Sequence, residues 1–402
     1  MNIIKDPAGP ADYDRRIHSI VLHYTVSDED DARETLKHGG VSAHFLIPKT
    51  AKSDGTDVWQ CVDTTDRAWH AGVSVWQNRT GLNDTSIGIE IINYAYGLVQ
   101  DSGEVLFTYQ IESQLKEFIL QTLQEKDKNL YQLLTEEKLL TAFLSDMRRG
   151  LVPPRDRIAY EKKVSPELIA KYKKFTKEWR EKNDPFQPIK QEDLYQLEQQ
   201  GKLKWDEFTE HQHLMLVDLL KKLLEELQIR DGDTIRYQID PTAIIGHSDI
   251  APGRKQDPGP KFPWKYLADH GIGAWPDEKQ VSAIEKEIQL DQAINYKWIQ
   301  DNLRLYGYKI ESTGQLDTQT KDVIRVFQMH FEPENYSGEP TGKTISILEA
   351  LIKKYYPNHQ SDYPRCFSSF AKKKSNFFPS PKSDTKSATN NRMTAFNCCV
   401  IS

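Results

Sequence analysis

Apolar residues in the first hundred positions gather in short runs separated by turn-forming residues. Four runs have the length and composition of buried strands: 17–23, 43–47, 58–62 and 87–92. Between the first two, residues 31–38 have a helical composition that stops at Gly39 and Gly40. The pattern predicts short strands and a helix, which is typical of an α/β domain.

The pattern changes after Gly97, where the chain becomes rich in Lys, Glu and Leu up to about residue 204. Apolar residues there recur at helical spacing, and prolines interrupt the run, which predicts several helices instead of one. Residues 208–227 then form a strongly amphipathic stretch, and a strand-like run follows at 243–246. We therefore expect an α/β domain, residues 1–110 and 205–280, with a mixed central sheet flanked by helices and a helical insertion at 111–204.

A separate small domain is predicted for residues 288–356. Its apolar spacing indicates three short helices, the first ending at Gly307 and the others covering 318–331 and 344–355. From residue 357 to 402, Ser, Lys, Asn and Pro dominate and aliphatic residues are few. This composition is typical of a disordered tail.

Charge and cysteine content narrow the class of protein. Charged residues make up 28% of the 402 residues, the net charge is −6, and no run of about 18 apolar residues occurs, so a transmembrane helix is not expected. The first ten residues also lack the basic start and apolar stretch of a secretory signal. Four cysteines are too few for a disulfide scaffold, and Cys61 is interpreted as a core thiol.

The segment 246–260 carries the densest set of chemically useful residues. It is rich in Pro and Gly, follows a predicted strand, and contains His247, Asp249, Lys255 and Asp257. A catalytic zinc ion takes three protein ligands, usually His with His or a carboxylate, and leaves one position for water. A single loop does not easily supply all three ligands.

Two further candidates lie in predicted strands. His23 ends the first strand and is a natural second imidazole, although a hydrogen-bonded core histidine is the alternative. Asp257 alone could equally be part of an Asp-Pro turn. Glu90 stands inside an apolar strand, where a carboxylate is expensive to bury without a partner. Glu90 could therefore project into a cleft and accept a proton, or face solvent from an edge strand.

These segments resemble, in order, the motifs of the type 2 N-acetylmuramoyl-L-alanine amidases, in particular the AmiD-like enzymes with a C-terminal peptidoglycan-binding domain. The resemblance covers roughly residues 10–110 and 205–356. The segments that carry it are 21–25 (VLHYT), 42–45 (SAHF), 68–72 (AWHAG), 86–90 (SIGIE), 246–252 (GHSDIAP), 254–260 (RKQDPGP) and 262–264 (FPW). It implies the amidase type 2 or peptidoglycan-recognition-like fold.

The resemblance also implies roles for individual residues. His23, His247 and Asp257 correspond to the three ligands of a Zn²⁺ cofactor. Glu90 corresponds to the catalytic base and Lys255 to the lysine that stabilises the oxyanion. The implied reaction is metal-assisted hydrolysis of the bond between N-acetylmuramoyl and L-alanine in peptidoglycan or its fragments.

Other residues are candidates for weaker roles. His44, His70 and Trp69 are candidates for substrate contact, with structural support or core packing as the alternative. Residues 288–356 resemble the peptidoglycan-binding-like module of the same enzymes, through segments 306–308 (YGY), 327–331 (FQMHF) and 336–339 (YSGE). Peptidoglycan or muropeptides are thus the expected partners, and nucleic acid is not.

Two features depart from the family. The insertion at 111–204 has no counterpart that suggests a role. The chain ends in Cys399-Val400-Ile401-Ser402, which matches a prenylation box with a farnesyl-type last residue, and Cys398 beside it could be palmitoylated. The tail 357–402 holds seven basic and two acidic residues, so a lipidated basic tail could associate with a membrane.

Prenylation is eukaryotic and peptidoglycan is bacterial, so one hypothesis is a bacterial protein delivered into a eukaryotic host and anchored there by its lipid. Two other interpretations of the chain stay open. One is a peptidoglycan-recognition protein without catalysis, and the other is a membrane-tethered effector that acts on another amide or on a protein partner. The complete set of expected ligands, with Glu90 and Lys255, favours the enzyme.

Overall fold

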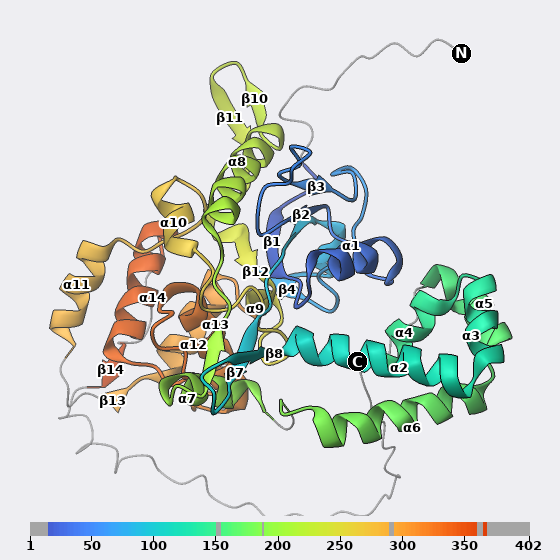
Figure 1. Cartoon of the computed structure of the whole chain (residues 1–402). Helices are drawn as coiled ribbons and strands as arrows, with labels where there is room; N and C mark the ends of the chain where they lie inside the picture. Colours follow the sequence, from blue (N-terminus) through green and yellow to red (C-terminus); the bar gives the residue numbers. More distant parts are fainter. Residues whose placement is uncertain (1–14, 150–153, 187–188, 289–292, 360–364, 368–402) are drawn as a thin grey trace, which may run out of the picture.

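A five-stranded mixed sheet forms the centre of the first domain in the computed structural model (Figure 1). The structure describes residues 15–149, 154–186, 189–288, 293–359 and 365–367. The strands are β1 (Ser19–Tyr24), β2 (Phe45–Ile47), β3 (Trp59–Gln60), β6 (Ser86–Ile91) and β12 (Ile244–Gly246). Their order is β12-β1-β6-β2-β3, and every neighbouring pair is parallel except β2 with β3. The predicted mixed sheet flanked by helices is confirmed. We call residues 15–107 and 206–275 the sheet domain.

Helices cover the sheet because their apolar residues fall on one face. Helix α8 (Glu210–Glu226) starts at Thr209, whose hydroxyl accepts a hydrogen bond from the Gln212 amide, and it buries Leu216, Leu220 and Leu223. These leucines share one apolar core with the buried residues of β1 and β6. Helix α1 (Glu29–His38) ends before Gly39, and α10 (Trp264–Asp269) follows the Pro-rich loop.

The insertion forms a helical lobe with an apolar core of its own. Its helices are α2 (Thr108–Lys126), α3 (Lys128–Glu136), α4 (Leu140–Arg149), α5 (Pro154–Lys163) and α6 (Pro166–Asn183). Their buried side chains, among them Leu123, Phe143 and Tyr172, form one cluster that contains no residue of the sheet domain. Figure 1 shows this lobe projecting to one side of the sheet. The lobe is therefore a separately packed unit.

Smaller elements lie where the lobe and the sheet domain meet, some of them within the sheet domain itself. They are β7 (Tyr96–Val99), β8 (Val105–Phe107), β9 (Leu203–Trp205), η2 (Gln191–Asp193) and α7 (Leu194–Gln199). Strands β8, β7 and β9 form an antiparallel three-stranded sheet in that order. Four strands form two hairpins: β4 (Val75–Trp76) with β5 (Arg79–Thr80), and β10 (Ile229–Asp231) with β11 (Thr234–Tyr237). Single turns occur at η1 (Leu82–Asp84), η3 (Pro241–Ala243) and α9 (His247–Ile250).

The C-terminal domain, residues 293–356, packs directly on the sheet domain. Its helices are α12 (Tyr296–Tyr306), α13 (Thr318–Phe331) and α14 (Gly342–Tyr355), preceded by α11 (Glu278–Glu287). Strands β13 (Ala293–Ile294) and β14 (Cys366–Phe367) pair beside them. One apolar cluster contains Val21, Trp76 and Ile250 of the sheet domain together with Trp298 and Phe327 of this domain. The two domains therefore share a core.

Two sequence-based expectations are tested by these elements. Cys61 was expected in the core, but it is exposed: the strand predicted at 58–62 has only the two residues of β3, and Cys61 lies beyond its end. In the part of the chain that the structure describes, no helix combines the length and the apolar content needed to cross a membrane.

Candidate metal centre

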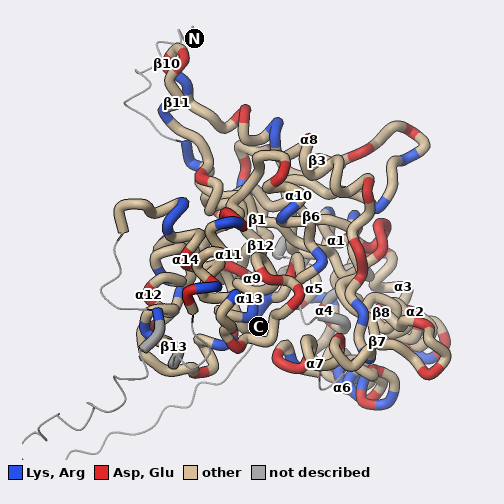
Figure 2. Tube along the Cα trace, turned by 90° about the vertical axis from the view of Figure 1, so that its left-hand side faces the viewer, with Lys and Arg blue, Asp and Glu red and all other residues tan. Residues whose placement is uncertain are grey.

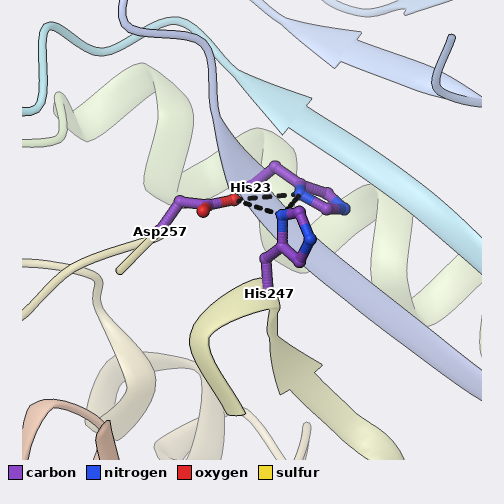
Figure 3. Close-up of side chains that lie close together, drawn as sticks. All are labelled: His23, His247 and Asp257. Atoms are coloured by element: carbon purple, nitrogen blue, oxygen red, sulfur yellow. Dashed lines mark hydrogen bonds and ion pairs between the residues drawn. The ribbon is translucent and has the colours of Figure 1, made fainter. Parts of the chain in front are cut away.

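Two imidazoles and one carboxylate converge where β1 and β12 end side by side. His23 lies in β1, and His247 is the first residue of α9, directly after β12. The two parallel strands pair Leu22 with Gly246, so the residues that follow are neighbours. Asp257 reaches the same point from the loop beyond α9 (Figure 3). The structure thus brings together the three residues expected to bind metal.

The three potential ligand atoms are nearly equidistant. Asp257 Oδ2 lies 3.0 Å from the Nδ1 atoms of His23 and of His247, and the two Nδ1 atoms are 3.1 Å apart. A tetrahedral zinc ion with bonds of about 2.0–2.1 Å separates its ligand atoms by roughly 3.3 Å. The cluster therefore has nearly the dimensions of one face of a zinc tetrahedron.

A chain of hydrogen bonds fixes the tautomer of His23. The Ser86 hydroxyl donates to the Leu82 carbonyl at 2.6 Å, so its oxygen accepts from Nε2–H of His70 at 3.2 Å. Nδ1 of His70 then carries a lone pair and accepts from Nε2–H of His23 at 3.0 Å. The remaining nitrogen of His23, Nδ1, therefore directs a lone pair at Asp257.

His247 is oriented in the same way by the backbone. Its Nε2–H donates to the Ala71 carbonyl at 3.1 Å, so its Nδ1 also presents a lone pair to Asp257 Oδ2. Two nitrogen lone pairs and a carboxylate oxygen repel one another unless a cation lies between them. The donor set, two imidazoles and one carboxylate, is one that zinc prefers. The residues present therefore fit a zinc ion.

Electrostatics keep two of these groups, His23 and Asp257, free of protons. Burial is the main cause that lowers the pKa of His23 to about 4; His247 and Lys255 act in the same direction, and Asp257 opposes them. Burial alone would raise the pKa of Asp257, but the two histidines hold it well below its usual range. Burial also lowers the pKa of His70, well below the ordinary imidazole value. At neutral pH His23 and Asp257 therefore present unprotonated donor atoms to a cation.

Glu90 lies on the His23 side of the sheet. Parallel pairing of β1 with β6 sets Glu90 beside His23, and neighbouring residues in register point to the same face. Ser86 and Gly88 share that face of β6 by alternation. A Cβ on Gly88 would lie 2.3 Å from the His70 ring, so only glycine leaves room for this imidazole. Glu90 is half-buried, as expected for a carboxylate at the wall of a site.

Lys255 precedes Asp257 by two residues in the same loop. Its backbone N–H donates to the Ala251 carbonyl at 3.0 Å, and its side chain is half-buried. The ammonium group lies near enough to help lower the pKa of His23. Lys255 is therefore placed to act on charge that develops at the metal centre.

The three weaker candidates lie in different environments. His44 is fully buried and holds the backbone, because its Nδ1 accepts from the Gly88 amide at 2.9 Å and its Nε2 donates to the Asp66 carbonyl at 3.3 Å. His70 supports His23, as described above. The Arg67 guanidinium lies 4.0 Å from the centre of the Trp69 ring, but Trp69 is still 53% exposed. Part of this ring is therefore accessible to a ligand.

The sequence analysis missed Ser86, which orients His70. Its only signal was alternation: Ser86, Gly88 and Glu90 fall on one face of a single strand. The candidate lipidation residues Cys398 and Cys399 lie outside the described residues.

The mixed sheet and the converging side chains define an α/β protein with a candidate three-ligand metal centre of the kind that hydrolases use. Residues 13–138 and 191–260 match the family described as N-acetylmuramoyl-L-alanine amidase, and residues 293–348 match the family described as "Putative peptidoglycan binding domain". The chain belongs to the N-acetylmuramoyl-L-alanine amidase family and carries both domains.

Individual relatives agree with this assignment over most of the chain. The N-acetylmuramoyl-L-alanine amidase AmiD of Escherichia coli K12 is 29% identical over 342 residues, which cover 85% of this chain and 84% of AmiD. A solved AmiD complex with the substrate anhydro-N-acetylmuramic acid-L-Ala-D-γ-Glu-L-Lys superposes with a TM-score of 0.54 at 27% identity, covering 86% of this chain and 91% of AmiD. AmpDH3 of Pseudomonas aeruginosa, in complex with anhydromuramic pentapeptide, has a TM-score of 0.54 at 28% identity and covers 88% and 99%.

Proposed function

We propose that the protein is a zinc-dependent hydrolase that cleaves the amide bond between N-acetylmuramoyl and L-alanine in peptidoglycan or its fragments. The observation that carries the proposal is the meeting of three lone pairs, from His23, His247 and Asp257, within 3.1 Å of one another. The two relatives solved with anhydromuramoyl peptides support this substrate class.

The reaction assigns a task to each group. Zinc bound at the three ligands would lower the pKa of a water molecule and polarise the scissile carbonyl. Glu90, beside His23 on the same face, takes the proton of that water and passes it to the leaving amine of L-alanine. Lys255 offsets the negative charge that develops on the carbonyl oxygen. The exposed Trp69 ring is placed to stack on the sugar or peptide.

Digestion of purified peptidoglycan tests the proposal directly. The zinc-loaded protein should release free stem peptides and leave the glycan strands intact, as measured by mass spectrometry of both fractions. Glu90→Gln should lower kcat by about 100- to 10,000-fold without loss of bound zinc. Cys61→Ser, on an exposed residue of the same domain, is the matched control and should keep full activity.

The same digestion decides between the alternatives. A protein that binds peptidoglycan but releases no peptide would be the non-catalytic recognition protein. A protein that ignores peptidoglycan would support the remaining interpretation, an effector that acts on another amide or partner. Full activity in Glu90→Gln would remove Glu90 from the role of base.

We propose separately that the protein is delivered into a eukaryotic host and attached to a membrane there through Cys399, with Cys398 beside it. Its support is the terminal Cys-Val-Ile-Ser sequence and the basic residues of the tail. Incubation with farnesyltransferase and farnesyl diphosphate should add one farnesyl group by mass spectrometry, and Cys399→Ser should prevent the addition. An unchanged mass of the unaltered chain would dismiss the lipid anchor and leave the amidase proposal untouched.

A further inference from the structure

Asp249 is a buried carboxylate that links the metal loop, defined as residues 246–257, to the C-terminal domain. It lies in α9, two residues after His247, and is 1% exposed. Its Oδ1 accepts from the Tyr308 hydroxyl at 2.7 Å, and its Oδ2 accepts from Nδ1–H of His330 at 2.9 Å. Both donors belong to the C-terminal domain, so the turn that carries His247 is held by a different domain.

The His330 ring is held in position for this contact by an aromatic ring on each face. Its ring stacks between Trp264 of the sheet domain, at 3.7 Å between ring centres, and Phe331, at 3.9 Å. Its Nε2 is buried and has no hydrogen-bond partner among the described residues. The ring proton therefore belongs on Nδ1, where it is donated to Asp249.

The Asp249 carboxylate also stabilises α9, the single helical turn that begins at His247. Its Oδ2 also accepts from the Gly246 amide at 2.8 Å, and Gly246 is the last residue of β12. Removing a donor from the C-terminal domain would leave a buried carboxylate short of a partner, which is costly in an apolar interior. The turn would then rearrange to reach water, and Nδ1 of His247 would move with it.

A second contact secures the same domain against the sheet domain. The Trp76 ring packs edge-on against Tyr308, at 4.9 Å between ring centres, and donates through Nε1 to the Thr242 carbonyl at 3.1 Å. Gly307 lies so close to this ring that a Cβ would be 2.7 Å from it. Tyr308 is therefore held in place independently of Asp249.

We propose that the C-terminal domain is a structural part of the metal centre, with His330 and Tyr308 as positioning residues that act through Asp249 on His247. The inference rests on the proposed zinc centre and deepens it. It assigns to the C-terminal domain a task at the reaction site, in addition to any binding of peptidoglycan.

Two variants of the full chain at one position separate the hydrogen bond from the stacking. His330→Phe keeps an aromatic ring between Trp264 and Phe331 but loses the donor. His330→Asn loses the ring but places an amide N–H near the former Nδ1. The zinc dissociation constant, measured by competition with a chromophoric chelator, should rise about 10- to 100-fold in His330→Phe and stay near the wild-type value in His330→Asn. Tyr308→Phe should raise it by a smaller factor.

A matched variant controls for loss of stability. Leu348 lies in the same domain and is 1% exposed. Leu348→Ala therefore removes buried apolar volume from this domain without changing a contact of Asp249. It should lower the Tm but leave the zinc dissociation constant unchanged. The absorption spectrum of the Co²⁺-substituted protein provides a second readout: its d–d bands should shift in His330→Phe and not in Leu348→Ala.

The outcomes separate the two levels of the argument. If wild-type protein binds no zinc, the metal centre fails and this inference fails with it. If wild-type protein binds zinc and His330→Phe binds it equally well with an unchanged Co²⁺ spectrum, only the positioning role is overturned. A zinc affinity that follows Tm in all variants, Leu348→Ala included, would also overturn it, because the effect would then be general instability.

Discussion

The C-terminal domain and the helical lobe are both additions to the sheet domain, but they are attached in opposite ways. The C-terminal domain shares one apolar core with β1 and β4 and contacts the metal loop through Asp249. The lobe packs its helices around Phe143 and Tyr172 in a core of its own. The C-terminal domain is therefore packed together with the candidate active site, whereas the lobe is packed separately from it.

This difference in packing agrees with the residue ranges that match the two families. The C-terminal domain matches a recognised domain, whereas residues 139–190, most of the lobe, fall in the gap of the amidase match. That gap holds 13 basic and 7 acidic residues in a chain whose net charge is −6. Figure 2 shows Lys and Arg gathered along α6, several of them paired with acids of the same lobe, such as Lys173 with Asp146 at 2.9 Å. Because the lobe has an apolar core and ion pairs of its own, we expect a change inside it to leave the candidate metal centre undisturbed.

The largest expected effect is at the shared core. Trp76→Ala removes a ring that is 2% exposed and packs against Tyr306 and Tyr308. We expect a loss of about 3–5 kcal/mol in unfolding free energy, because a large aromatic side chain leaves a cavity. The sheet domain and the C-terminal domain should still unfold in one transition, measured by urea denaturation with hydrogen exchange of β1 and α13. Two separate transitions in the parent protein would contradict a common core.

Phe143→Ala is the matched change in the lobe. Phe143 is fully buried, with the Tyr172 ring 5.3 Å away, so the local loss should also be about 3–5 kcal/mol. Here, however, exchange protection should fall in α2–α6 and persist in β1, β6 and α13. Zinc affinity and amidase activity should remain at wild-type values. A large loss of either would show that the lobe supports the site after all, and the contrast between the two regions would fail.

The sequence predicted well those features that depend on local periodicity. The helix expected at 318–331 is α13 with the same limits, and the first strand differs from the expected 17–23 by two residues at its start and one at its end. The candidate ligand set was also predictable, because His23 and His247 stand in motifs at or just after the ends of two neighbouring parallel strands, and Asp257 lies in the loop that follows His247. Local pattern and family motifs together predicted which residues form this cluster.

What the sequence could not predict depends on contacts between distant residues. The bond from His330 to Asp249 spans 81 positions, and nothing at either residue indicates the other. Ser86 acts through His70, which is brought near by chain packing and not by spacing. The exposure of Cys61 was missed because a predicted strand of five residues has only two. Such features follow from tertiary packing, which overrides local preference.

Acid should affect the two regions differently. The pKa of His23 is lowered to about 4, whereas the unfolded chain binds this proton near pH 6.5, so the metal-free sheet domain loses stability as pH falls through that interval. His23 alone should contribute about 3 kcal/mol of this loss at pH 4, because each pH unit is worth about 1.4 kcal/mol. Residues 108–190 contain no histidine, so the lobe should be insensitive over the same range. Urea unfolding of the metal-free protein between pH 7 and pH 4.5 measures how the unfolding free energy depends on pH, and His23→Gln should make this slope smaller, with His70 contributing to the rest. An equal slope in His23→Gln would assign the acid sensitivity to other groups.

The smallest expected effect is at an ion pair where the lobe meets the sheet domain. Lys116 of α2 lies 2.6 Å from Asp31 of α1, with the lysine side chain 36% exposed. A partly solvated pair of this kind is worth about 0.2–1 kcal/mol, so a double-mutant cycle with Lys116→Met and Asp31→Asn should give a coupling energy in that range, and 1 M salt should reduce it. Activity should not change in any of the three variants. A coupling above about 2 kcal/mol, or a drop in kcat with the pair removed, would mean that the lobe is fastened to α1 strongly enough to transmit its movements to the sheet. In that case the lobe, like the C-terminal domain, would have to be counted as part of the site.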